Sequence, residues 1–153
     1  MPNQRPHFLA AYNKARADQD AQIVIDAIPY AKFLGVEAFK RDGQLLFKLP
    51  PKKSNIGNPT LPAIHGGAVA GFMELAAVVY LLMEWDTEKL QSDKPKVPKV
   101  VDFSVDFIRA CRYEDTYASC DMVRQGRKMA NIGVQVWQKD PSILTATARA
   151  HYL

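Results

Sequence analysis

The feature that most constrains the fold is a long apolar run with one charged residue in its middle. Residues 68–83 carry Glu74 as their single charged side chain. The run is nearly long enough to span a membrane, but the central carboxylate and the glycines near its start favour a helix inside a soluble fold. We therefore expect a central helix over residues 66–85. Because this helix is apolar on nearly every side, other elements must cover nearly every side of it.

The segment before the hairpin region is predicted to be helical. Residues 8–27 mix alanine and branched apolar residues with charges, which indicates an N-terminal helix within an extension that covers residues 1–29. Pro29 suits the first position of a short helical turn, and Gly35 suits its end.

Two strands and a loop are expected next. Residues 36–49 predict two strands joined at Asp42-Gly43, a pair that favours the positive φ of a tight hairpin turn. Residues 50–64 are rich in Pro, Gly and Asn and predict a loop.

The hydrophobic period changes to two after the central helix and a polar connection over residues 86–99. Four strands are expected, and the short turns between them imply antiparallel pairing. The whole chain, residues 1–153, then forms one α+β domain in which a curved antiparallel sheet of about six strands wraps around the central helix. The four segments are residues 100–109, 115–124, 127–138 and 143–153.

Composition narrows the class of protein. With 48% hydrophobic and 24% charged residues, the 153-residue chain is typical of a globular domain. A net charge of +4 suits the binding of an anionic small molecule. The sequence lacks a dense Lys/Arg run of the kind that binds nucleic acid. Cys111 and Cys120 are too few for a disulfide framework or a zinc knuckle, and the first residues lack a secretory pattern. We expect a cytoplasmic protein that binds no metal, no membrane and no nucleic acid.

The start of the central helix is a candidate binding site. The first N–H groups of a helix have no intrahelical partner and carry partial positive charge, so they can polarise a carbonyl or stabilise an oxyanion. Gly66 and Gly67 allow another group to approach this backbone closely, although they also suit a tightly started helix. His65 either contacts a bound carbonyl or closes the helix end.

Glu74 lies on the same side of the predicted helix as Gly67 and Gly71, at spacings of seven and three residues. The seven residues between Gly67 and Glu74 separate them by roughly 10 Å along the axis. Two helices packed antiparallel across a two-fold axis would bring each Glu74 to the partner's Gly67, with Gly71 easing the contact. The alternative role for Glu74 is structural, as a polar residue that forms a hydrogen bond at a subunit interface.

The sequence "HGGAVAGFMELAA" resembles the signature of the PaaI-like branch of the hotdog-fold acyl-CoA thioesterases. Both have His-Gly-Gly followed by an acidic residue nine positions after the histidine. The resemblance extends over about residues 30–153 and implies hydrolysis of a coenzyme A thioester in a homodimer or a dimer of dimers with shared active sites. It implies that Glu74 is the general base or nucleophile, that the Gly67 N–H polarises the thioester carbonyl, and that His65 orients the substrate beside Gly66.

The loop before the histidine departs from this family. Many relatives have an asparagine six residues before the histidine, where this chain has Pro59. Asn58 lies seven residues before His65 and Asn55 lies ten before it. We take Asn58 as the candidate for the role of the family's asparagine. Some relatives also have a hydroxyl residue one turn after the acid, where this chain has Val78.

The resemblance implies no cofactor other than the coenzyme A of the substrate. Arg127 and Lys128, after the Gly126 turn, are candidates to contact its nucleotide, with Arg109 and Arg112 as alternatives. The other interpretation of each is a solvated charge of a turn or a sheet edge. The sequence does not identify the acyl group of the substrate. The aromatic and apolar residues of the helix suit an acyl pocket and a protein core equally well; they are Phe72, Met73 and Tyr80. Two other functions remain, a hotdog hydratase or dehydratase of enoyl or hydroxyacyl thioesters and a non-catalytic acyl-CoA-binding or sensing protein.

Overall fold

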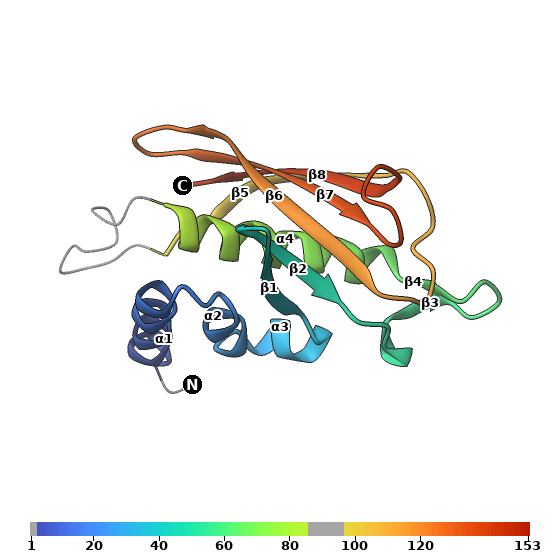
Figure 1. Ribbon diagram of the computed structural model, residues 1–153, viewed down its shortest axis with the longest axis horizontal. Coiled ribbons are helices and arrows are strands. Elements are labelled where there is room, and N and C mark those ends of the chain that lie inside the picture. The colour runs from blue at the N-terminus through green and yellow to red at the C-terminus, as the bar shows by residue number, and fades with distance from the viewer. Residues whose placement is uncertain (1–2, 86–96) are drawn as a thin grey trace.

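The computed structural model describes residues 3–85 and 97–153. It is an α+β fold in which a long helix lies against a curved six-stranded antiparallel sheet (Figure 1). Most of the polar connection expected over residues 86–99 falls outside the described residues.

Three short helices form the N-terminal part of the chain: α1 (Arg5–Asp18), α2 (Gln22–Asp26) and α3 (Pro29–Leu34). The single helix predicted over residues 8–27 is wrong. Gln19 adopts a left-handed conformation with φ of 54° and ends α1, so the chain turns before α2 begins. The short helix that starts at Pro29 and ends at Gly35 is confirmed, since Gly35 has φ of 81°.

The predicted hairpin is confirmed as β1 (Glu37–Arg41) and β2 (Gln44–Leu49). Asp42 and Gly43 both have positive φ, as a two-residue turn between twisted strands requires. The next segment is more ordered than a loop. It contains a 3-10 turn, η1 (Lys53–Asn55), and a small two-stranded ladder of β3 (Ile56–Asn58) and β4 (Ala63–Ile64) that leads directly into the long helix.

The last four predicted strands are confirmed as β5 (Val100–Phe107), β6 (Thr116–Gln125), β7 (Ala130–Trp137) and β8 (Leu144–Tyr152). The sheet order is β1-β2-β6-β7-β8-β5, with every neighbouring pair antiparallel. Among the described strands β5 pairs with β8 alone, so one side of β5 is an edge of this sheet.

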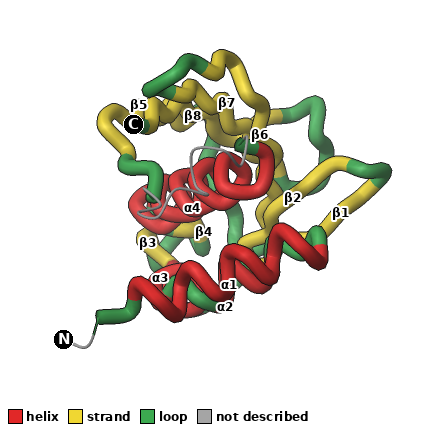
Figure 2. Tube along the Cα trace, turned by 90° about the vertical axis from the view of Figure 1, so that its left-hand side faces the viewer, coloured by secondary structure: helices red, strands yellow, loops and turns green. Residues whose placement is uncertain are grey.

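The long helix α4 (Gly66–Glu84) lies between the sheet and the N-terminal helices (Figure 2). Apolar side chains from both layers meet it in one core that includes Val24, Phe47 and Ile132. Among the helices that the structure describes, α4 is the one long and apolar enough to span a membrane, but more than half of the apolar window is buried inside this fold. The expectation of cover on nearly every side is wrong along one stripe, because Gly67 and Glu74 are exposed.

Candidate active site

The start of α4 is closed by the side chain of His65. Its Nδ1 accepts a hydrogen bond of 2.8 Å from the Gly67 N–H, which makes His65 the N-cap of the helix. A Cβ on Gly67 would lie 2.9 Å from this nitrogen, so the second glycine is what allows the ring to approach. The Gly66 N–H has no hydrogen-bond partner among residues 3–85 and 97–153. A substrate carbonyl can therefore bind the Gly66 N–H directly, or displace His65 to bind that of Gly67.

Asn55 holds the residue before the helix in place. Its carbonyl accepts a 2.7 Å hydrogen bond from the His65 N–H. The Asn55 side chain is buried, and its Nδ2 has no hydrogen-bond partner among the described residues. A buried amide donor without a protein partner is costly, so this nitrogen is available to donate to a group bound beside His65.

Asn58 has a different position. Its side-chain oxygen accepts hydrogen bonds from the Thr60 N–H, the Thr60 hydroxyl and the Leu61 N–H, and so stabilises an exposed turn. The structure therefore brings Asn55, and not Asn58, next to His65. The spacing along the sequence did not predict this, because β3 and the turn after it lie between Asn55 and the start of α4.

Glu74 lies on the open stripe of α4, by which we mean Gly67, Gly71, Glu74 and Val78, all exposed or half-buried. Its carboxylate forms no hydrogen bond or ion pair with the part of the chain that the structure describes. Its backbone carbonyl accepts a 3.3 Å hydrogen bond from the buried Tyr152 hydroxyl of β8. Burial, together with the Glu74 charge, raises the pKa of Tyr152, so this donor stays protonated.

The open stripe runs between β5 and α3. At one end, a Cβ on Gly66 would lie 3.3 Å from the Phe107 ring at the end of β5. Further along, a Cβ on Gly71 would lie 2.8 Å from the Tyr30 hydroxyl of α3. Gly71 thus makes room for Tyr30 of its own chain, which differs from the expected role of easing contact between two helices.

Two adjoining grooves open beside the start of α4. The first, about 350 Å³, is lined by Gly66 and Phe107 among others. The second, about 900 Å³, extends past Arg112 and Tyr113, and Arg109 lines both grooves. A long ligand that starts at the helix end therefore passes the guanidinium groups named as alternatives for the nucleotide.

Arg127 and Lys128 lie elsewhere. They occupy the turn between β6 and β7, where Ala130 pairs with Tyr152, whereas Phe107 beside Gly66 is at the opposite end of β5. Figure 1 shows this turn and the start of α4 at opposite ends of the molecule. Within one chain, the structure does not bring these two residues to the candidate site.

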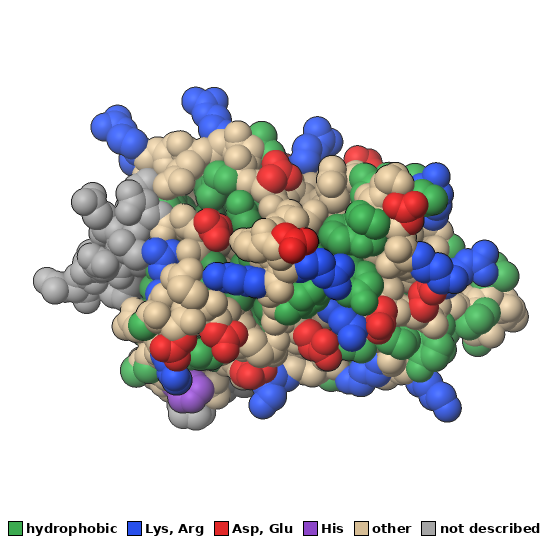
Figure 3. All heavy atoms as spheres, in the orientation of Figure 1, with side chains coloured by type: hydrophobic (Ala, Val, Ile, Leu, Met, Phe, Trp, Pro, Cys, Tyr) green, Lys and Arg blue, Asp and Glu red, His purple; other side chains and the backbone are tan. Residues whose placement is uncertain are grey.

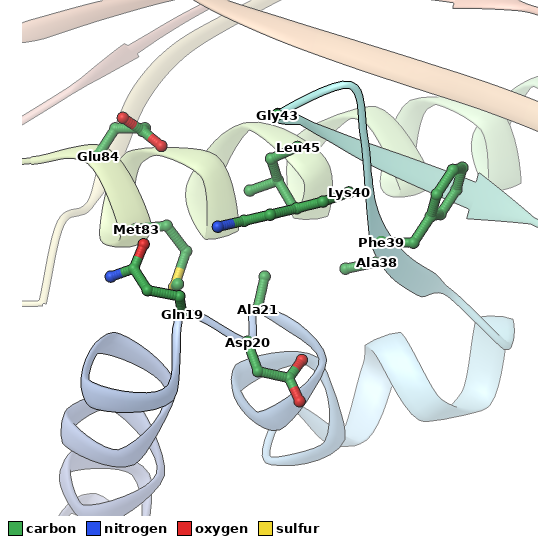
Figure 4. Close-up of a pocket in the computed structure, with 10 residues that line it drawn as sticks. All are labelled: Gln19, Asp20, Ala21, Ala38, Phe39, Lys40, Gly43, Leu45, Met83 and Glu84. Carbon is green, nitrogen blue, oxygen red and sulfur yellow. The ribbon is translucent and has the colours of Figure 1, made fainter.

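Charge density alone does not locate a nucleotide site. On the face shown in Figure 3, basic and acidic side chains are interspersed over the surface. A small cavity of about 100 Å³ lies where the α1–α2 junction meets the β1–β2 hairpin and the last turn of α4 (Figure 4). Asp20, Lys40 and Glu84 line it. It is at the far end of α4 from His65 and is too small for a thioester of coenzyme A.

The cysteines are core residues. Cys111 and Cys120 are both buried, and burial raises the pKa of each thiol, more strongly for Cys120. A thiol that stays protonated is a poor nucleophile. The interpretation of Cys120 as a core residue is confirmed.

Comparison with known proteins identifies the family. Residues 61–145, more than half of the chain, match the thioesterase superfamily. The Escherichia coli (strain K12) medium/long-chain acyl-CoA thioesterase YigI is 27% identical over 135 residues, covering 82% of this chain and 85% of that protein. A Chromobacterium violaceum protein of known crystal structure is 34% identical, with a TM-score of 0.73 over 93% of this chain and 94% of that one.

The fold is also that of a Bacillus halodurans protein solved with CoA, with a TM-score of 0.70 over 99% of this chain and 93% of that one. At 14% identity this likeness concerns the fold alone. The chain belongs to the thioesterase superfamily, has the hotdog fold and is a thioester hydrolase.

Proposed function

We propose that the protein is a cytoplasmic acyl-CoA thioesterase of the PaaI-like branch whose active sites are each built from two chains. The observation that carries this proposal is the placement of Glu74 on the same open stripe as the start of α4, but roughly 10 Å away along the axis. One carboxylate cannot serve a carbonyl held at its own helix start over that distance. In a two-fold pair of antiparallel α4 helices, each Glu74 meets the partner's Gly66 and Gly67.

The substrate class is supported by the E. coli relative, which is named as a medium/long-chain acyl-CoA thioesterase, and by the grooves beside Gly66. In this proposal the thioester carbonyl binds the N–H groups at the start of α4. Arg109 and Arg112 face the nucleotide from the same chain, and Arg127 and Lys128 contribute from the partner. Asn55 takes the role that was expected of Asn58, with its side-chain amide as the donor.

The chemistry needs only water and the carboxylate. Glu74 takes a proton from water as the oxygen attacks the carbonyl carbon, the C–S bond breaks, and the thiolate leaves and is protonated. If Glu74 attacks directly, the C–S bond breaks, the thiolate leaves and an anhydride forms, which water then hydrolyses to the carboxylic acid and the free Glu74 carboxylate. Incorporation of ¹⁸O into Glu74 during a single turnover in labelled water would establish the anhydride route, because only attack of water on the Glu74 carbonyl of the anhydride can label the protein.

The first test replaces Glu74 with glutamine, which keeps the size of the side chain and removes the base. With a panel of acyl-CoA esters and a thiol-release assay, we expect kcat to fall at least about a hundredfold while the circular dichroism spectrum is unchanged. Equal turnover by a folded Glu74→Gln protein refutes the role of Glu74. A change in the absorbance of an enoyl-CoA without thiol release would indicate a hydratase. Binding of an acyl-CoA without turnover would indicate a sensing protein.

The second part of this test concerns sharing between chains. Glu74→Gln chains are mixed with Gly67→Val chains, in which the new side chain meets His65. Each mixed dimer has one intact site, so a random mixture should recover about a quarter of the wild-type activity. If verified mixed dimers show no activity above the two parents, the two-chain site is wrong.

A further inference from the structure

Two aromatic rings on α3 are exposed, and one of them, that of Tyr30, lies beside α4. Tyr30 is 48% exposed and Phe33 58% exposed, and their rings stack with centroids 6.2 Å apart. The Lys52 ammonium lies 4.8 Å from the centre of the Phe33 ring and donates to the Phe33 carbonyl. We call Tyr30 and Phe33 the aromatic platform. It is held in place, yet about half of its apolar surface faces water.

Gly71 fixes the platform next to the candidate site. A Cβ at this position would lie 2.8 Å from the Tyr30 hydroxyl and 3.1 Å from the ring. Gly71 is four residues after Gly67 and three before Glu74, so Tyr30 lies over α4 between the helix start and the acid. The fully buried Ala31 anchors α3 from its other side.

No large ring of α4 itself is available there. Phe72 and Met73, considered above for an acyl pocket, are completely buried in the core, and Tyr80 lies two turns beyond Gly71. The open stripe carries two glycines, the acid and the half-buried Val78. Within one chain, hydrophobic contact for a group bound along this stripe therefore comes from a neighbouring element, and α3 offers the ring of Tyr30 beside Gly71.

We propose that the aromatic platform is the acyl-binding surface of this enzyme and selects acyl groups with a medium-length alkyl chain or an aryl ring over acetyl. This inference rests on the proposed function. In the two-chain site, a thioester held at the start of α4 reacts with the partner's Glu74 and extends its acyl group along the stripe of its own α4, where Tyr30 lies against Gly71. Burial of alkyl or aryl carbon against the two rings stabilises long substrates, whereas acetyl is too short to reach them.

The test compares kcat/KM for acetyl-CoA, octanoyl-CoA and phenylacetyl-CoA in three variants. Tyr30→Ala and Phe33→Ala remove one ring each. Gly71→Ala leaves both rings but displaces the flexible end of Tyr30. The matched control is Val123→Ala, which removes an apolar side chain that is 63% exposed on β6.

For Tyr30→Ala and Phe33→Ala, we expect octanoyl and phenylacetyl kcat/KM to fall about tenfold or more, and acetyl kcat/KM to change less than about twofold. Gly71→Ala should also lower the ratio of octanoyl to acetyl kcat/KM. Gly71→Ala combined with Tyr30→Ala should be no worse than Tyr30→Ala alone, because both act on the same contact. Val123→Ala should keep the wild-type ratio of octanoyl to acetyl activity.

An unchanged octanoyl-to-acetyl ratio in folded platform variants overturns this inference and leaves the proposed function standing. If the wild-type protein hydrolyses none of these esters, the proposed function fails, and calorimetric binding of the same esters then decides on the platform. A binding preference for octanoyl-CoA that Phe33→Ala abolishes supports it, and equal binding of acetyl- and octanoyl-CoA by the wild type refutes it.

Discussion

At the residue scale, His65 and a bound substrate compete for the same donor. The Gly67 N–H donates its hydrogen bond to Nδ1 of His65. This nitrogen accepts only when it carries a lone pair, so the imidazole is in the tautomer that leaves Nδ1 unprotonated. The expected assignment of Gly67 as the carbonyl donor therefore requires His65 to move, whereas Gly66 can act without any movement.

His65→Ala removes the cap and should lower the free energy of unfolding by about 1 kcal/mol. His65→Asn, a good N-cap residue, should recover most of this loss. Urea denaturation of the three proteins measures the effect. If the ring also orients the substrate, His65→Asn restores stability but not kcat. Equal stability of the wild type and His65→Ala would contradict the capping role.

At the element scale, α1 closes the other end of α4. The last carbonyls of a helix lack intrahelical donors, and a cation there is favourable. The Arg16 guanidinium of α1 donates to the carbonyls of Leu82 at 3.2 Å, of Trp85 at 3.1 Å and of Met83. The N-terminal extension is thus bonded to the central helix, which keeps α3 and its aromatic platform beside the open stripe.

Arg16→Met keeps helix propensity and hydrophobic length but removes these hydrogen bonds. Because they involve a charged donor, we expect a loss of about 1.5–3 kcal/mol in the free energy of unfolding. Lys14→Met is the matched control, since Lys14 pairs with Asp18 on the exposed face of α1 and should contribute almost nothing. Equal denaturation midpoints for the two variants would rule out this capping role.

At the scale of the whole molecule, β5 offers the surface for the proposed dimer. One side of this strand is unpaired, and its ends carry exposed apolar side chains, Val100 and Val101 at one end and Phe107 at the other. A long apolar edge strand is a template for pairing with another chain. Pairing two β5 strands across a two-fold axis would continue the sheet and place two α4 helices side by side.

Val101→Lys puts a charge on this edge and should convert the dimer to a monomer, with loss of thioesterase activity and unchanged secondary structure. Sedimentation velocity and circular dichroism measure the two properties. Val123→Lys, on an exposed position of β6, is the control and should stay dimeric and active. An active monomer, in either the wild type or Val101→Lys, would refute the shared site.

The elements were largely readable from the pattern of residues. The central helix, the Asp42-Gly43 hairpin and the last four strands each follow a local period or turn preference, and all are confirmed. The break at Gln19 and the short strands β3 and β4 were missed. Gln19 has no side-chain preference for positive φ, and strands of two or three residues are too short to establish a period.

For the site, the spacing of Gly67, Gly71 and Glu74 is enough to predict that they share a face of α4, because helical geometry is regular. The packing of the layers then leaves this face open, seats Tyr30 on Gly71, and brings Asn55 rather than Asn58 next to His65. The same packing separates Arg127 from the helix start. A hydrophobic period reports the burial of one element, whereas contacts between distant segments depend on how the elements pack together.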